Sequence, residues 1–177
     1  LHCIAWPMFS NTQEAKYNEN DNDAKWREKN RFSNIEWKAA CKQAGINDRN
    51  NRFFKELKKV GVLVSSGRRD NQDKDPCTSF LHRTLFEYSA ARGLALDKNN
   101  YRTWIAEKAK KRPGEPGGVF WFAPEWWEML TFLSGIENID VQLLLDAVDQ
   151  NCDDVFHSML YLKAKFVGAA DGTNHLS

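Results

Sequence analysis

The chain has 177 residues, of which 42% are hydrophobic and 12% aromatic. This length is typical of one domain or two small lobes, and the apolar content excludes a disordered, collagen-like or coiled-coil chain. No apolar run approaches the roughly 18 residues that a membrane-spanning helix needs, and the first residues lack the basic start of a signal peptide. We therefore expect a soluble intracellular protein, cytoplasmic or nuclear, without a membrane partner.

An uneven distribution of charge lies behind the formal net charge of +1. Residues 25–112 carry 22 Lys and Arg against ten acids, a net charge of +12, whereas residues 113–177 carry two against ten, a net charge of −8. Such asymmetry indicates a polyanionic partner for the basic half, and nucleic acid is the first candidate. The alternatives are that the two halves neutralise each other within one fold, or that the acidic half docks a second protein.

The first part of the chain, residues 1–33, is predicted to be a polar arm, because residues 10–34 are rich in Asn, Asp, Glu and Lys and offer little to bury. A first helix is predicted over residues 35–43, with Asn34 as its cap, and Gly45 ends it. Its inward face is expected to consist of Ile35, Ala39, Ala40 and Cys41.

A second, strongly amphipathic helix is predicted over residues 48–60, with Asn47 as its cap and Gly61 at its end. At 100° per residue, its apolar side consists of Phe53, Phe54, Leu57 and Val60. The opposite side consists of Asn51, Arg52, Lys55, Lys58 and Lys59. A short apolar run at 62–64 and a charged, turn-prone loop at 65–76 follow, and this loop holds Arg68 and Arg69.

Two more helices are predicted before the hinge. The first is capped by Thr78 or Ser79 and ends at Gly93, with a strand over residues 77–82 as the alternative interpretation. The second covers residues 98–111, with Tyr101, Trp104, Ile105 and Ala109 on one side and Lys98, Lys108, Lys110 and Lys111 elsewhere.

Residues 113–118 contain two prolines and three glycines and mark a predicted hinge, which separates a basic lobe over 34–112 from an acidic helical lobe over 119–168. The acidic lobe begins with a buried strand or extended plug at 119–122. Helices are predicted from Pro124, from Asn138 or Asp140, and from Asp153. Residues 169–177 are expected to be a flexible tail.

These elements predict a mainly α protein, a helical bundle with a helix-turn-helix or winged-helix-like amino-terminal lobe and at most a small β-hairpin. The segment NRFFKELKKVGVLVSSGRRDNQDKDP resembles the recognition helix and first wing strand of winged-helix regulators, within a match that covers about residues 34–82. The resemblance implies a wing that holds Arg68 and Arg69 and a return strand where the third helix is predicted. Asn51 departs from helix-turn-helix repeats, which usually have an apolar residue at this position.

The predicted function is non-enzymatic nucleic-acid binding, with DNA favoured over RNA. Asn51 and Arg52 can donate to base edges, whereas lysines neutralise phosphates at any sequence. The predicted binding residues are Asn51, Arg52, Lys55, Lys58, Lys59, Arg68, Arg69, Lys108, Lys110, Lys111 and Arg112. The acidic lobe is expected to self-associate or to dock a partner. The alternative is a helical adaptor or subunit of a larger assembly, in which the basic face is an ordinary solvated helix surface.

Catalytic and metal sites are not expected from the sequence. Two C-x4-H pairs, Cys77 with His82 and Cys152 with His157, could together supply four zinc ligands, but on a helix five positions diverge by about 140°. No phosphate-loop, dinucleotide, zincin or hydrolase-elbow motif is present. A metal-dependent nuclease built on Asp146, Asp149, Asp153 and Asp154 is the catalytic alternative, but these residues are better explained as solvated carboxylates and a helix cap. No cofactor is predicted.

Overall fold

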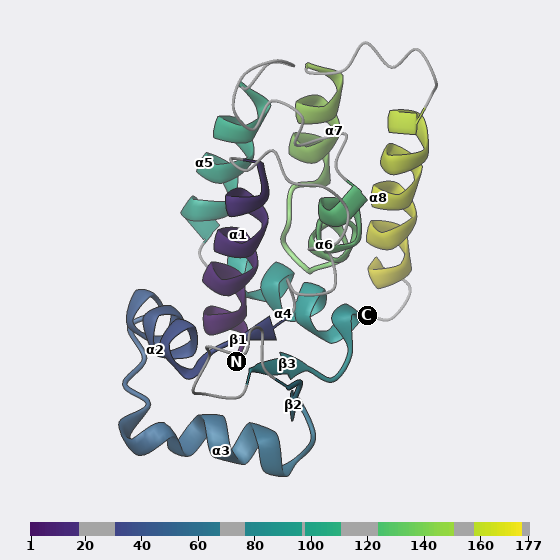
Figure 1. Ribbon diagram of the computed structural model, residues 1–177. Helices are drawn as coiled ribbons and strands as arrows, with labels where there is room; N and C mark the ends of the chain where they lie inside the picture. Colours follow the sequence, from purple (N-terminus) through teal and green to yellow (C-terminus); the bar gives the residue numbers. More distant parts are fainter. Residues whose placement is uncertain (18–30, 68–76, 97, 111–123, 151–157, 175–177) are drawn as a thin grey trace. The chain divides into compact units, whose positions relative to one another are not determined.

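The computed structural model describes residues 1–17, 31–67, 77–96, 98–110, 124–150 and 158–174 (Figure 1). The chain divides into two compact units, Leu1–Ala90 and Ala91–Ser177. The hinge predicted at residues 113–118 lies outside the described residues. The helix predicted over residues 98–111 belongs to the second unit, so our assignment of this helix to a basic lobe over 34–112 was wrong.

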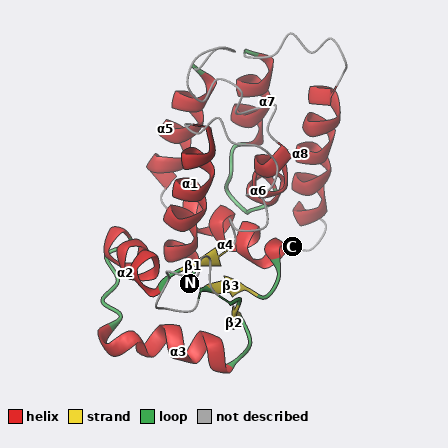
Figure 2. Ribbon diagram, in the orientation of Figure 1, coloured by secondary structure: helices red, strands yellow, loops and turns green. Residues whose placement is uncertain are grey.

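Helices form most of the described chain, and three short strands accompany them, which confirms the mainly α fold with a small antiparallel sheet (Figure 2). The first unit contains α1 (His2–Tyr17), β1 (Arg31–Phe32), α2 (Asn34–Gln43), the 3-10 turn η2 (Arg49–Asn51), α3 (Arg52–Lys59), β2 (Leu63–Ser65) and β3 (Thr78–Phe80). The division between the units falls within α4 (Arg83–Leu96). The second unit also contains α5 (Lys98–Ala109), α6 (Pro124–Ser134), α7 (Val141–Asp149) and α8 (Ser158–Asn174).

The sheet has the order β1-β3-β2, with β3 antiparallel to both neighbours. Thr78 pairs with Phe32 on one side and with Ser65 on the other. The strand alternative for this segment is therefore confirmed, and the prediction that Thr78 or Ser79 caps a helix was wrong. Residues 78–80 alternate in burial because successive strand side chains point to opposite faces. The helix that follows begins at Arg83 and continues through Gly93 to Leu96.

A helix occupies the start of the chain, where we predicted a polar arm over residues 1–33. That prediction was wrong for α1 and β1, while residues 18–30 lie outside the described part. Ile4, Ala5, Met8 and Phe9 are buried, at the spacing of one helical face. The ring of Phe9 packs edge-on against Phe86 with centroids 5.5 Å apart. Packing against a residue distant in sequence thus stabilises a segment whose later half is polar.

Aromatic rings form the core under α2 and α3. Trp37 is fully buried and lies between Phe32 and Phe54, with ring centroids 6.0 and 5.2 Å away. Phe32 also contacts Phe80 of β3, which joins the helices to the sheet. Figure 1 shows α2 and α3 beside the three strands. Three residues that we placed on inward faces are instead exposed: Ile35 at 75%, Val60 at 68%, and Ala39.

In the second unit, α7 packs against both α5 and α8, and α6 packs against α8. As predicted, Tyr101, Trp104 and Ile105 of α5 are buried. Asp140 caps α7 by accepting a hydrogen bond from the Leu143 amide, one of the two caps predicted. None of the described helices combines the length and the apolar character needed to cross a bilayer.

Helix α8 continues to Asn174, so the prediction of a flexible tail over 169–177 was wrong for residues 169–174. Its inner face consists of Met159, Leu162 and Phe166. The Ala169 carbonyl lies close to Gly135, where an added Cβ would be 3.2 Å from that oxygen. Contact with this glycine extends the packed part of the helix beyond the point where the sequence becomes small and polar. The predicted start of this helix at Asp153 and the segment 119–122 lie outside the described residues.

Candidate nucleic-acid interface

The connection between α2 and α3 is organised by the carboxylate of Asp48. It accepts hydrogen bonds from the Phe53 amide at 2.8 Å, the Phe54 amide at 3.2 Å and the Trp37 indole at 3.0 Å. Burial opposes ionisation of this carboxyl, but these hydrogen bonds outweigh it and hold its pKa below the ordinary value. The side chain that accepts hydrogen bonds from the first amides of α3 is thus Asp48 and not the predicted cap, Asn47. Asp48 was expected near the positive end of the helix dipole, and its bond from Trp37 also joins α3 to α2.

The backbone before α3 departs from the regular helix that we predicted from residue 48. Asn50 has φ 58° and Asn51 has φ 55°, both in the left-handed region. The α-helix starts only at Arg52, and Asn51 is half-buried, with no capping hydrogen bond from its side chain. The connection from α2 therefore spans residues 44–51, which is longer than the three or four residues of a simple helix-turn-helix.

Helix α3 presents a cationic surface to solvent. Arg52, Lys55 and Lys59 are exposed and follow the i, i+3, i+7 spacing that places residues on one side of a helix. We call these three residues the α3 cationic face. None of them forms an ion pair with another described residue, and Glu56 is the acid that shares this side. Phe54 and Leu57 are buried on the opposite side, so the predicted separation of faces is confirmed for these residues.

Lys58 differs from the other lysines of α3. It is half-buried, its Nζ lies 3.3 Å from the Ser65 hydroxyl, and this nitrogen is also 5.0 Å from the centre of the Phe54 ring. The side chain therefore extends along the apolar core toward β2. We accordingly leave it out of the α3 cationic face, although the sequence placed it among the binding residues.

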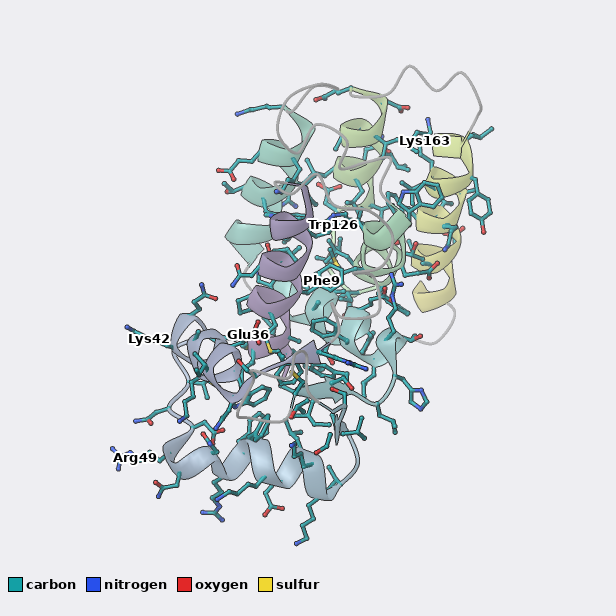
Figure 3. All side chains as sticks on the ribbon, in the orientation of Figure 1. Phe9, Glu36, Lys42, Arg49, Trp126 and Lys163 are labelled. Atoms are coloured by element: carbon teal, nitrogen blue, oxygen red, sulfur yellow. The ribbon has the colours of Figure 1, made fainter. Side chains whose placement is uncertain are left out.

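The first unit also exposes three cations that we did not predict as binding residues. Lys38 and Lys42 are exposed one turn apart on α2, and Arg49 is exposed in η2. Figure 3 shows Lys42 and Arg49 directed away from the core of the unit. The i, i+4 spacing of the two lysines was the sequence pattern that could have identified them. Both lysines also line an open hollow between α2 and Asp48.

Cys41 lies at the base of the same hollow. Burial, and then the neighbouring Asp48 carboxylate, raise the pKa of its thiol above the ordinary value. The group therefore stays protonated at neutral pH, whereas a nucleophile or metal ligand needs the thiolate. The hollow thus combines two exposed ammonium groups with an inert thiol.

Two of the remaining predicted residues are described in the second unit. Lys108 is only 9% exposed, with its Nζ 5.8 Å from the centre of the Trp104 ring, so little of its side chain is accessible to a partner. Hydrophobic packing of its stem on α5 explains this burial. Lys110 is exposed in the turn directly after α5. Four predicted residues lie outside the described part of the chain: Arg68, Arg69, Lys111 and Arg112.

The residues considered for metal binding are dispersed where the structure describes them. Across the described ranges, no three His, Cys, Asp or Glu residues gather closely enough to hold an ion. Cys77 is buried and His82 is exposed. Asp146 accepts a hydrogen bond from Gln142 at 2.7 Å, and Asp149 accepts one from Lys163 at 2.5 Å. The other members of these sets, Cys152, Asp153, Asp154 and His157, lie outside the described residues.

Comparison with known proteins found no match for this chain among protein-family models, curated proteins or solved structures. Arguments about function therefore depend on the geometry of the chain itself.

Proposed function

We propose that the amino-terminal unit is a non-enzymatic nucleic-acid-binding module that contacts duplex DNA through the α3 cationic face. One observation carries this proposal: Arg52, Lys55 and Lys59 are exposed on one side of α3 without an ion-pair partner among the described residues. Unpaired cations in a row match the regular spacing of phosphates along a nucleic acid, and each contact gains free energy by releasing a condensed counterion.

The order of elements supports a winged-helix-like module. A helix and a strand precede the pair α2 and α3, and a hairpin of β2 and β3 follows, with β3 between the other two strands. This order supplies the return strand that the resemblance to winged-helix regulators implies. The segment between these two strands includes Arg68 and Arg69 in the sequence, and both lie outside the described residues.

The start of α3 determines how phosphates would be bound. The amino terminus of a helix often binds an anion through its free backbone amides. In α3 the Asp48 carboxylate already accepts hydrogen bonds from the amides of Phe53 and Phe54. We therefore expect phosphate contacts to come from the side chains of the α3 cationic face rather than from the amides at the start of the helix.

The test is a binding titration of duplex DNA, single-stranded DNA and RNA at several salt concentrations, with wild type and the double variant Arg52→Gln/Lys55→Gln. We expect the variant to bind duplex DNA at least tenfold more weakly and to lower the slope of log K against log salt by about 2, close to 0.9 per lost phosphate contact. The matched control is Arg102→Gln/Lys163→Gln, which removes the same charge from the second unit. Both control cations already pair with carboxylates, those of Asp140 and Asp149.

A control variant that loses as much affinity as the α3 variant would show that net charge, and not this surface, drives binding. Absence of binding to every probe at low salt would remove the proposal. Tighter binding of single strands would instead favour stacking on exposed rings over docking in a groove.

We also propose that the carboxy-terminal unit docks a protein partner, with self-association as the first candidate. Its support is the outer side of α8, where Tyr161 is 60% exposed and Val167 is 43% exposed. On the helix these two residues lie about 120° apart, and the exposed small residues Ala164 and Gly168 lie on the arc between them. Exposed apolar side chains gathered on one helix are typical of interaction surfaces. An adaptor that uses only this surface is the alternative to a nucleic-acid binder.

A further inference from the structure

The most unusual backbone of the described chain lies just before the α3 cationic face. Asn50 and Asn51 are consecutive left-handed residues, with φ/ψ of 58°/23° and 55°/34°. Asparagine tolerates this conformation better than most residues, yet glycine adopts it at a lower cost. Neither asparagine side chain makes a hydrogen bond with another described residue. The left-handed conformation explains why asparagine is suited to these backbone positions, but no contact with the described residues explains the two side-chain amides.

The surrounding contacts hold this corner in place. The Asn51 amide donates to the Asp48 carbonyl at 3.2 Å, and the Asp48 carboxylate binds α3 and Trp37 as described above. Asn50 is exposed between two exposed arginines, Arg49 and Arg52. The side-chain amide of Asn50, which can both donate and accept hydrogen bonds, is thus exposed on a backbone that hydrogen bonds hold in place. In the sequence it lies next to cations that we expect to contact phosphates.

Side chains of this kind can distinguish bases, whereas ammonium groups on phosphates cannot. The asparagine amide forms a bidentate pair with adenine in the major groove, and arginine forms one with guanine. Residues at the amino-terminal end of a docked helix are those that reach base edges. Since Asp48 closes this end to phosphate, the exposed side chains of the corner are the groups left to contact the groove.

We propose that Asn50, flanked by Arg49, is a base-reading residue that gives this protein a sequence preference on duplex DNA. This inference rests on the proposed function and extends it from phosphate contacts to specificity. The amide of Asn50 recognises one base pair, and the α3 cationic face anchors the helix to the backbone without regard to sequence.

The left-handed backbone supplies a matched test, because glycine keeps the conformation and removes only the amide. The full-length wild type, Asn50→Gly and the control Asn47→Ala are each incubated with a random-sequence duplex library, and bound DNA is sequenced. Asn47 is an exposed asparagine of the same connection with an ordinary backbone. We expect Asn50→Gly to lose about tenfold of the preference at one base pair, while its affinity for non-specific duplex stays within twofold of wild type.

Three results would overturn the inference. One is an unchanged preferred sequence in Asn50→Gly, and another is an equal loss of preference in Asn47→Ala. The third is binding of duplex DNA by the wild type with no preference for sequence. This result would contradict the role of Asn50 but not the proposed function. Failure of wild type to bind any nucleic acid at low salt removes both. Thermal melting followed by circular dichroism confirms that each variant is folded.

Discussion

Helices α3 and α8 are both built on a buried apolar side, yet they present opposite chemistry to solvent. The outer side of α3 carries Arg52, Lys55 and Lys59, and the outer side of α8 carries Tyr161 and Val167. A core needs only one side of each helix, so the other side is free to differ. This difference is the basis on which we propose a polyanionic partner for the first unit and an apolar partner for the second.

The cations of the two units differ as much as their outer helices. In the second unit, Arg102 pairs with Asp140 at 3.1 Å and Lys163 pairs with Asp149 at 2.5 Å. Lys165 pairs with Glu128. These pairs consume positive charge within the unit, whereas the α3 cationic face has no such partner among the described residues. A sum of charges along the sequence therefore overstates the basic surface, because it gives paired and unpaired cations the same weight.

The largest effect is expected from truncation of the exposed apolar side of α8. The double variant Tyr161→Ser/Val167→Ser should weaken self-association about 100-fold, because aromatic and aliphatic anchors dominate interfaces of this kind. Sedimentation equilibrium measures the change. The control variant Ile35→Ser/Val60→Ser removes equally exposed apolar side chains from the first unit and should leave the association unchanged. A monomeric wild type, or equal weakening in both variants, would contradict this assignment of α8.

A smaller effect is expected from loss of the Asp48 charge. Asp48→Asn should lower the free energy of unfolding by about 1–2 kcal/mol at neutral pH, since it weakens the capping of α3. Because hydrogen bonds hold the pKa of this carboxyl below 3.8 in the folded state, its ionisation stabilises the protein above that value. The stability difference between wild type and variant should shrink as the pH falls through the folded-state pKa.

Urea unfolding at a series of pH values measures this dependence. Asp171→Asn, an exposed acid of α8, is the control and should change stability by less than about 0.5 kcal/mol at every pH. A difference for Asp48→Asn that stays constant down to pH 2 would contradict the role given to its charge.

Effects no larger than that of Asp48→Asn, and of opposite sign in the two units, are expected at two glycines. Gly45 ends α2 with φ 66°, so Gly45→Ala should destabilise by about 1–2 kcal/mol. Gly168 lies within α8, and an added Cβ there would meet nothing within 4 Å, so Gly168→Ala should stabilise by about 0.5–1 kcal/mol. Chemical denaturation measures the change in the free energy of unfolding for each variant, and we expect opposite signs. If Gly168→Ala is destabilising instead, a close neighbour must lie at the outer side of α8.

The sequence pattern predicted those features of the candidate site that depend only on the spacing of residues along one helix. The 100° spacing placed Arg52, Lys55 and Lys59 opposite Phe54 and Leu57, and the structure shows this arrangement. The same spacing could not show that Lys58 extends to Ser65. Nor could it show that Lys108 is buried beside Trp104, because in each case the deciding contact depends on how the side chain packs in the folded unit.

The sequence by itself determined the mainly helical class, the amphipathic α3 and the cap of α7, because hydrophobic periodicity and capping residues act within a few positions. Tertiary structure alone decided that residues 2–17 form a helix, that residues 78–80 form the central strand, and that Asn50 and Asn51 adopt left-handed conformations. Each outcome involves a contact with another part of the chain. The helix packs on Phe86, the strand pairs with Leu63, and the left-handed corner follows Asp48, which is bound by Trp37. These contacts depend on burial and hydrogen bonds that exist only after distant segments have met.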